Sequence, residues 1–372
     1  MEVKIEKLDH FGRGITKINN KICFVEDALP EEIVEIKVTK EKKNYLLAEV
    51  VEIKKKSKDR ITPICPYTKK CGGCNLAHMT FQKENEFKEM KVIEIMKKFA
   101  DIEKEKIKEI VYDEPYHYRN KITLHEKDGM IGLFAKKSND IVSVENCLLV
   151  EDKLNDQIKK LTPSKNQEIV LKIGNKTKEI LNSKDQKKYI ISIIGDKKYK
   201  VSKESFFQVN SKITEKLYEE VKAIVTEKNI KKVLDLYAGT GTIGIYVSDM
   251  VEKVLGIESC KEAVMDAIDN IKLNHKTNCR YILGKVENLT KEITKEYDLA
   301  IIDPPRAGLK EKVVEKLLEI TPKTLIYIAC DPITLARDLK KLQRKYNVSY
   351  IRPYNMFPRT YHVECVCLLK LR

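Results

Sequence analysis

The feature that most restricts the fold of this chain is a regular alternation of strand and helix patterns that begins near residue 205. Short apolar runs alternate with amphipathic runs of helical period. They fall at 232–237, 254–258, 281–283, 298–303 and 324–330 for strands, and from 242, at 261–274 and at 311–319 for helices. Alternation of this kind builds a mostly parallel sheet with helices on both faces. We therefore expect a doubly wound α/β domain over residues 205–372.

The first strand-to-helix turn of this domain carries a glycine pattern that is typical of nucleotide binding. The run 235–244 contains Gly-x-Gly-x-x-Gly, and Glu258 ends the next strand. Glycines let a cofactor lie against the backbone, and a carboxylate at that strand end accepts hydrogen bonds from ribose hydroxyls. The pattern fits both NAD and S-adenosylmethionine. Asp235 favours the second, because an acid beside the turn suits a cationic methionine group better than a pyrophosphate.

The last strand of the alternation leads directly into Cys330. Asp331 can cap the following helix with Pro332 in its first position, which would turn the positive helix end toward the sulfur and favour a thiolate. A buried core cysteine is the alternative, since free cysteines are among the most buried residues. The run 303–306, Asp-Pro-Pro-Arg, occupies the end of the fourth strand, where doubly wound folds hold substrate. Together with the other motifs of the chain, it favours a catalytic cysteine over a core cysteine.

The first 55 or so residues predict a small barrel of β-strands. Apolar and polar residues alternate over five runs separated by turn residues, at 3–8, 14–19, 21–25, 32–39 and 45–53. A formal net charge of +15 suggests a polyanionic partner, and nucleic acid fits better than a membrane surface. An ordinary barrel without a role in RNA binding is the alternative. We place the domain boundaries at 1–56, 57–204 and 205–372.

Cysteine usage predicts a metal centre in the second domain. No apolar run approaches the ~20 residues of a membrane span and no signal-peptide core opens the chain, so we expect a cytoplasmic protein with few disulfides. Cys65, Cys71 and Cys74 fall within ten residues, with two glycines that let backbone amides approach the sulfurs. Cys147 is the best fourth ligand. Zinc also accepts four cysteines, and spacing does not exclude it.

Between the cysteines and the α/β domain, the pattern predicts a helix and a hairpin. The helix covers 81–98, with Phe87, Met90, Val92, Ile95 and Met96 as its buried stripe. The hairpin joins 122–125 to 130–134 through Asp128-Gly129. Aromatic and basic residues interleave at 116–121, where they could stack on unpaired bases and contact phosphates. A hairpin with a solvated cationic face is the alternative.

These motifs together resemble the RNA 5-methyluridine methyltransferase family. The resemblance rests on the runs 206–210, 235–244, 303–308, 330–339 and 356–364. The barrel, with Gly12-Arg13-Gly14 and the run 24–30, resembles the OB-like TRAM domain. The ribosomal RNA branch of this family carries a TRAM domain and a [4Fe-4S] site, whereas the bacterial tRNA branch usually lacks both. The resemblance therefore implies methylation of 23S rRNA, with a tRNA uridine as the alternative.

The resemblance also implies an architecture and a role for each site residue. It implies a Rossmann-like class I methyltransferase domain, the TRAM barrel and a central α+β iron–sulfur domain, with no membrane contact and no obligate protein partner. The positions that bind S-adenosylmethionine are Gln208, Tyr237, Glu258 and Asp303. The nucleophile is Cys330 and the base is Glu364. The cluster ligands are Cys65, Cys71, Cys74 and Cys147. Departures from the family at Tyr237, Ala329 and Arg359 involve no reacting group.

The chemistry requires a thiolate and a carboxylate at one uracil ring. Uracil C5 is a weak nucleophile until a thiolate adds to C6. After methylation the C5 proton must leave before the thiolate is eliminated, which requires a base. In methyltransferase sheets the last strand runs antiparallel beside the strand that bears Cys330, so we expect Glu364 to lie beside Cys330.

Three other functions fit the sequence less well. An RNA cytosine-5 methyltransferase usually has a second cysteine in the fourth-strand loop, and the run 303–306 has none. A radical methylthiotransferase needs Cys-x3-Cys-x2-Cys, which the chain lacks. The third alternative is an RNA-binding protein with a vestigial methyltransferase domain. Such a protein would not need the nucleophile, the base and the cofactor turn, and all three are intact in this chain.

Overall fold

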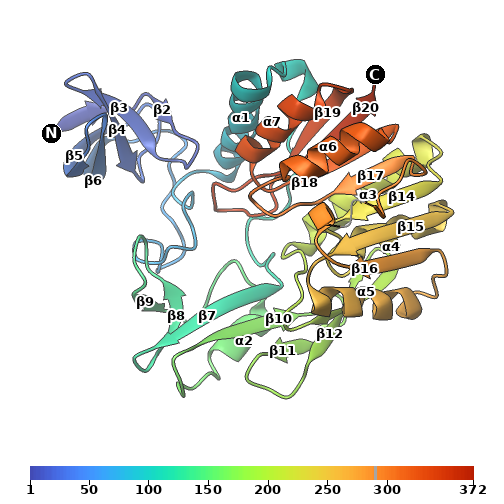
Figure 1. Cartoon of the computed structure of the whole chain (residues 1–372). Coiled ribbons are helices and arrows are strands. Elements are labelled where there is room, and N and C mark those ends of the chain that lie inside the picture. The colour runs from blue at the N-terminus through green and yellow to red at the C-terminus, as the bar shows by residue number, and fades with distance from the viewer. Residues whose placement is uncertain (289–290) are drawn as a thin grey trace.

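The computed structural model describes residues 1–288 and 291–372 (Figure 1). Its N-terminal strands are β1 (Glu2–Lys4), β2 (Lys7–Leu8), β3 (Gly14–Ile18), β4 (Lys21–Glu26), β5 (Ile33–Glu41) and β6 (Tyr45–Lys55). They form one sheet in the order β1-β5-β6-β4-β3-β2. The two end strands are consecutive in the chain and joined at Ile5, so this bend closes the sheet into a barrel. The predicted strand 3–8 is therefore two short strands, which belong to opposite edges of the sheet.

A five-stranded sheet forms the middle of the chain, in the order β11-β10-β7-β8-β9. Its strands are β7 (Lys121–Lys127), β8 (Met130–Phe134), β9 (Ile141–Ser143), β10 (Gln167–Ile173) and β11 (Ile180–Asn182), with α2 (Asp152–Ile158) packed against them. The predicted hairpin is confirmed, because Asp128 and Gly129 between β7 and β8 both have positive φ angles, as a tight primed turn requires. A second hairpin, β12 (Tyr189–Ile194) with β13 (Lys197–Ser202), leads to the C-terminal part.

The predicted helix is α1 (Phe81–Ala100), and it packs against the C-terminal part of the chain (Figure 1). Val92, Ile95 and Met96 of this helix are buried as predicted. Met90 is 47% exposed, so its place in the predicted stripe is wrong. The buried face of α1 instead carries charged side chains, among them Glu84 and Lys88.

The C-terminal part is a seven-stranded sheet in the order β16-β15-β14-β17-β18-β20-β19. Its strands are β14 (Lys232–Leu236), β15 (Lys253–Glu258), β16 (Cys279–Leu283), β17 (Leu299–Ile302), β18 (Thr324–Ala329), β19 (Tyr346–Tyr354) and β20 (Glu364–Leu371). The first five are parallel and β20 is antiparallel to β18. The predicted doubly wound domain is confirmed, with strand ends within two residues of the predicted runs.

Helices cover both faces of this sheet. One face packs against α1, α6 (Glu311–Ile320) and α7 (Pro332–Leu342). The other packs against α3 (Ser211–Glu227), α4 (Thr242–Val247) and α5 (Lys261–Leu273). In the described parts of the chain, none of the helices combines the length and the apolar composition needed to cross a lipid bilayer.

Candidate active site

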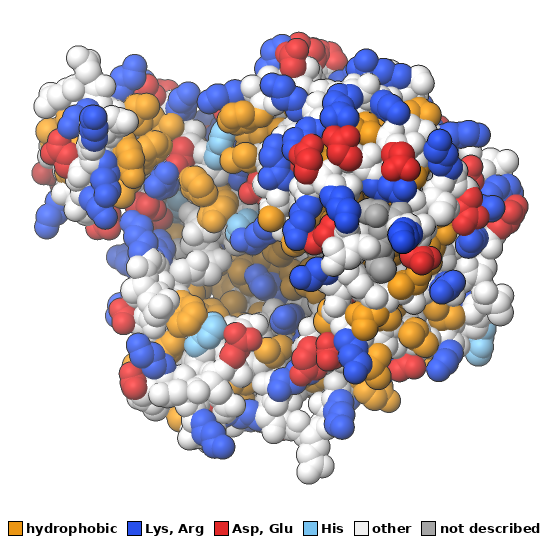
Figure 2. Space-filling model, in the orientation of Figure 1, with side chains coloured by type: hydrophobic (Ala, Val, Ile, Leu, Met, Phe, Trp, Pro, Cys, Tyr) orange, Lys and Arg blue, Asp and Glu red, His pale blue; other side chains and the backbone are white. Residues whose placement is uncertain are grey.

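A cavity of about 740 Å³ lies where the carboxyl ends of β14, β15, β17 and β18 face the central sheet. Figure 2 shows this hollow at the centre of the molecule, with apolar and basic side chains around it. Every residue of the predicted site lines it. These residues are Gln208, Tyr237, Glu258, Asp303, Cys330 and Glu364, together with Cys65, Cys71, Cys74 and Cys147. The structure thus brings the predicted catalytic, cofactor and metal residues to one cavity.

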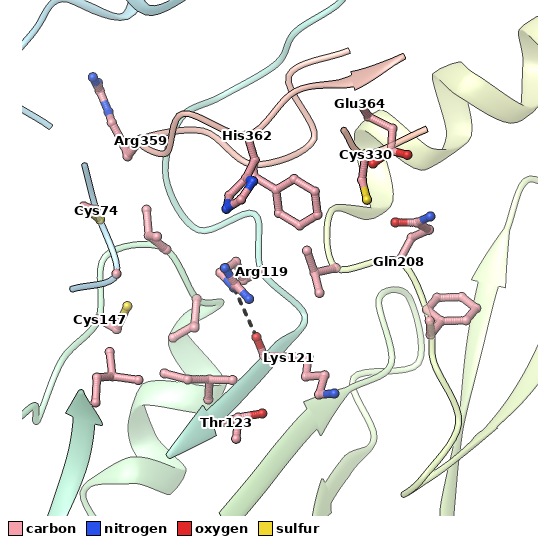
Figure 3. A pocket seen from close by; sticks show the side chains of 18 of the residues that line it. Cys74, Arg119, Lys121, Thr123, Cys147, Gln208, Cys330, Arg359, His362 and Glu364 are labelled. Carbon is pink, nitrogen blue, oxygen red and sulfur yellow. Dashed lines mark hydrogen bonds between the residues drawn. The ribbon is translucent and has the colours of Figure 1, made fainter. Parts of the chain in front are cut away.

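Cys330 and Glu364 lie side by side because two strands of the sheet pair in antiparallel fashion. Ala329 at the end of β18 is the partner of Cys365 in β20, so Cys330 and Glu364 follow and precede a paired position. Figure 3 shows both side chains at the same wall of the cavity, near Gln208. The predicted placement of Glu364 is confirmed, and strand pairing is its physical basis.

Burial and like charge raise the pKa of the Glu364 carboxyl. Its side chain is 3% exposed. Burial raises the pKa of Glu364 well above its usual range, the Asp303 carboxylate raises it further, and the Arg306 guanidinium opposes the rise. The pKa of Asp303 is raised by its own burial and by Glu258. A base with a raised pKa near neutrality is suited to proton removal.

Burial opposes the thiolate form of Cys330 that the helix start was expected to favour. Burial raises the pKa of the Cys330 thiol to about 11, Glu364 adds to the rise, and Arg306 opposes it. Asp331 caps α7 as predicted, since its Oδ1 accepts hydrogen bonds from the amides of Ile333 and Thr334 at 2.8 and 3.1 Å. Those amides are therefore already paired, and the partial charge of a helix end is too small to offset burial beside two carboxyls.

The glycine turn positions Glu258 through its backbone amides. Oε2 of Glu258 accepts a hydrogen bond from the amide of Gly239 at 3.0 Å, and Oε1 accepts from the amides of Ser259 and Cys260 at 2.6 and 2.7 Å. Gly239 has a φ of 54°, and a Cβ added there would meet no atom within 4 Å. The turn thus leaves open space beside a fixed carboxylate, as nucleotide binding requires.

Asp235 has a different place from the one that its sequence position suggests. It is 1% exposed and does not line the cavity. Its Oδ2 accepts a hydrogen bond from the amide of Gly244 at 3.1 Å. This carboxyl therefore holds the start of α4 against β14.

A buried cluster of charged and polar groups, which the sequence did not reveal, holds the loop that precedes Glu364. Lys88 of α1 donates hydrogen bonds to Glu84 Oε1 at 2.8 Å, Asn355 Oδ1 at 2.6 Å and the carbonyl of Phe357 at 3.1 Å. Glu84 accepts from the amide of Arg359 at 3.0 Å. We name Glu84, Lys88 and Asn355 the α1 clamp. Glu84 and Lys88 are four residues apart, on the same face of α1 as its buried apolar residues. This spacing is the sequence feature that could have revealed the buried pair.

The four predicted metal ligands line the other end of the cavity, on two separate segments. The amide of Gly73 lies 3.4 Å from Cys71 Sγ, and the amides of Leu149 and Val150 oppose the raised pKa of Cys147. Burial and the other three thiols raise the pKa of Cys74 to about 12. Within the described residues, no three His, Cys, Asp or Glu side chains converge closely enough for a single ion. Cluster ligands stand farther apart, because each binds a different iron. The donor set and its amides fit such a cluster.

The predicted aromatic and basic run 116–121 forms the wall between the two ends. Tyr116, Arg119 and Lys121 line the cavity, and Arg119 Nε donates to the carbonyl of Lys121 at 3.3 Å. His362, also in the lining, lies between the cysteines and Cys330 in Figure 3. Burial, Arg306 and Lys91 lower the pKa of His362 to about 4, so its imidazole is neutral.

Comparison with known proteins matches the whole chain. Residues 78–372 match the family described as tRNA (Uracil-5-)-methyltransferase, and residues 1–51 match the TRAM domain. An uncharacterized RNA methyltransferase of Clostridium acetobutylicum is 32% identical over 99% of this chain and 96% of the relative. One from Lactobacillus johnsonii is also 32% identical, over 100% of this chain and 96% of the relative.

A solved structure matches the fold over the same extent. The Pyrococcus abyssi tRNA (uracil-54, C5)-methyltransferase, in complex with S-adenosyl-L-homocysteine, has a TM-score of 0.80 and 26% sequence identity. The match covers 99% of this chain and 100% of that chain, so it includes the barrel, the cysteine segment and the α/β domain.

Proposed function

The chain belongs to the tRNA (uracil-5-)-methyltransferase family, and from that premise we propose that Cys330 and Glu364 methylate C5 of a uridine in 23S ribosomal RNA. The coarser function, RNA uracil-5 methylation with S-adenosylmethionine, follows from the family and its structural relatives. The observation that carries the mechanism is the pair of side chains at the cavity wall. A thiol and a carboxyl at adjacent ends of paired strands can reach C6 and C5 of one ring.

The first step belongs to Cys330. Its thiol gives its proton to solvent. The sulfur then adds to uracil C6 as the C5–C6 double bond opens, so the ring becomes an enolate whose C5 is nucleophilic. Because the pKa of this thiol is about 11 in the free protein, positive charge brought by the ligands is needed for ionisation. S-adenosylmethionine supplies the electrophilic methyl group and, as a sulfonium, such a charge.

The second step belongs to Glu364. Once C5 carries the methyl group, the carboxylate takes the C5 proton, the C5–C6 double bond re-forms, and the bond from C6 to the Cys330 sulfur breaks. The thiolate leaves, and the carboxyl holds the C5 proton, which its raised pKa favours, until that proton passes to solvent and the carboxylate is restored. We assign Gln208, Tyr237, Glu258 and Asp303 to cofactor binding, since all four line the cavity around the glycine turn.

The choice of RNA rests on the branch of the family. A TRAM barrel joined to a four-cysteine site is the feature that favours ribosomal RNA, and the barrel matches the TRAM family over residues 1–51. The specific observation that favours a tRNA uridine is the Pyrococcus relative, which modifies tRNA and matches this chain over the barrel and the cysteine segment as well. Two candidates therefore stand, with 23S rRNA as the proposal.

We also propose that Cys65, Cys71, Cys74 and Cys147 hold a [4Fe-4S] cluster, with zinc as the alternative. Support comes from four thiols on one wall and from amides that approach two of the sulfurs. When bound, such a cluster would crosslink the segment 65–74 to the loop at Cys147. Neither of the two chemical steps described above involves the cluster.

Mapping of 5-methyluridine in cells with and without the gene separates the two RNA candidates. We expect one or more 23S rRNA uridines to lose the C5 methyl group in the absence of the gene, with tRNA unchanged. Loss of the modification from tRNA alone would refute the ribosomal proposal and leave the uracil chemistry intact. Purified protein with labelled S-adenosylmethionine and transcripts of both RNAs provides the matching test in vitro.

A further inference from the structure

A second cavity, of about 580 Å³, lies between the N-terminal barrel and the hairpin of β7 and β8. Phe11 comes from a barrel turn, His125 and Phe134 from the hairpin, and Tyr361 from the loop before Glu364. We propose that this cavity binds the base of a second unpaired nucleotide of the RNA, distinct from the uridine that reacts at Cys330. This inference rests on the proposed function and adds a second recognition site to it.

The aromatic side chains of this cavity form stacking surfaces that face open space. The His125 and Phe134 rings are stacked, with centroids 3.8 Å apart and an interplanar angle of 17°. Phe134 is 38% exposed and Phe11 is 52% exposed. The Phe11 ring meets Tyr361 edge-on, with centroids 5.3 Å apart. Exposed rings that line a hollow are the arrangement by which proteins bind splayed bases.

Charge in this cavity favours a base over a phosphate. Lys136 forms an ion pair with Asp27 at 3.1 Å, and Lys137 pairs with Glu26 at 3.2 Å. Arg13 is held by Asp9 at 2.6 Å, and its guanidinium lies over the Phe11 ring. The cations are therefore already paired with carboxylates, so affinity for a phosphate is weak. Arg13 covers part of the Phe11 ring and His125 covers one face of Phe134, so a base would stack on the ring surface that stays exposed. The volume is within the range of small-ligand pockets.

The position of the second cavity links it to the catalytic one. Gly73 and Leu133 line both cavities, so the cysteine turn and β8 form the thin wall between them. A single strand of RNA with its target uridine at Cys330 can therefore reach around this wall with another base. Tyr361 carries the contact further, because it lines the second cavity only three residues before Glu364. Occupancy of the second cavity would thus select the nucleotides around the target.

Tryptophan fluorescence tests base stacking directly, because the chain contains no tryptophan. In Phe11→Trp the single indole would stand where a bound base stacks. We expect single-stranded oligouridylate to quench the emission of this indole. A control protein whose indole lies away from the cavity should show no such quenching. Phe99→Trp is that control, since Phe99 is 40% exposed near the end of α1 and lines neither cavity. Equal quenching in both proteins, or none in either, would overturn the proposal.

Affinity measurements locate the base. We expect Phe11→Ala and Phe134→Ala each to weaken binding of the transcript that serves as methylation substrate by roughly 5- to 100-fold, the usual effect of losing one stacked base. Phe99→Ala should change it less than about twofold. A series of transcripts, each lacking the base at one position, can locate the bound base. At one position other than the target uridine, loss of the base should weaken binding to the wild-type protein but cause no further loss of affinity in Phe11→Ala. Losses that add at every position would contradict the assignment.

The two proposals fail in different ways. Quenching of Phe11→Trp by RNA without methyl transfer to any uridine would keep the second cavity and refute the proposed reaction. Methyl transfer by wild type, with Phe11→Ala and Phe134→Ala binding RNA as tightly as wild type, would keep the reaction and refute the second cavity.

Discussion

The two ends of the large cavity are built in different ways. At one end, Cys330 directly follows β18 and Glu364 begins β20. These are neighbouring strands of a seven-stranded sheet, so backbone pairing fixes the relative position of the two residues. At the other end, the segment 65–74 and the loop at Cys147 belong to no common sheet, and their geometry depends on turns. Sites on rigid elements are more exact than sites on loops. The catalytic end should therefore fail sharply when one group is changed, and the cysteine end should fail as a unit.

Replacing the base gives the largest expected effect at the catalytic end. Glu364→Gln should still bind S-adenosylmethionine, add Cys330 to C6 and transfer the methyl group, because neither step consumes a base. Elimination should then stall, with turnover lowered by roughly 10²–10⁴-fold. The product is a covalent adduct of protein and methylated RNA, visible as a denaturation-resistant band on a gel.

Cys330→Ala in the same protein should abolish that band, since the adduct bond is to its sulfur. Normal turnover by Glu364→Gln would show that another group removes the proton. A variant that binds both ligands without forming the adduct would show that Glu364 is needed before methyl transfer.

Breaking the α1 clamp tests whether the catalytic end depends on the sheet alone. Lys88→Met removes the buried cation that joins Glu84 to Asn355 and the carbonyl of Phe357. Breaking a buried pair usually costs about 3–5 kcal/mol of unfolding free energy. We also expect a lower kcat, because the loop before Glu364 loses an anchor, while the Kd for S-adenosylmethionine stays near that of wild type. Denaturant unfolding and single-turnover kinetics measure the two effects.

Lys98→Met is the matched control on the same helix, because Lys98 is exposed. It should leave both quantities unchanged within about 0.5 kcal/mol. A Lys88→Met protein with lower stability but a normal kcat would mean that strand pairing suffices to place the base.

Much of the fold and of the catalytic end could be predicted from sequence because local patterns determine them. Strand and helix periods located the α/β domain. The resemblance to methyltransferase sheets supplied the antiparallel last strand, which places Glu364 beside Cys330. The surroundings of Asp235, Cys330 and Met90 differ from what the sequence suggested, for one shared reason. Each depended on what a side chain meets across the fold: Asp235 on the amide of Gly244, Cys330 on burial beside Glu364, and Met90 on which face α1 presents. Such contacts are long-range, and a local pattern does not encode them.

The pH profile sharpens the electrostatic account of the catalytic end. Burial raises the pKa of both Glu364 and Cys330, so the active ionised forms become more abundant as pH rises. Because Glu364 acts after methyl transfer, we expect kcat to increase by up to about tenfold per pH unit between pH 6 and pH 8. In Arg306→Gln this rise should shift to higher pH, because Arg306 opposes the increase of both pKa values. A profile that is flat from pH 5 to pH 7 would mean that the carboxyl is ionised there.

The cysteine end should affect the chemical step least, because no proton or methyl group passes through it. We expect anaerobically purified protein to be brown and to contain iron and sulfide, and Cys147→Ser to lose both as the crosslink between its two segments opens. The kcat with saturating RNA should then stay within roughly threefold of wild type, which is under 1 kcal/mol of barrier.

Cys279→Ser is the control, since Cys279 is part of β16, is absent from the cavity lining and should leave the metal in place. Stoichiometric zinc without iron would make the zinc alternative right. A fall in kcat as large as that of Glu364→Gln, with normal RNA binding, would contradict the view that the two ends of the cavity act separately. The route for such coupling would be the loop before Glu364, because the amides of Asn75 and Leu76, beside Cys74, donate hydrogen bonds to the carbonyl of Arg359.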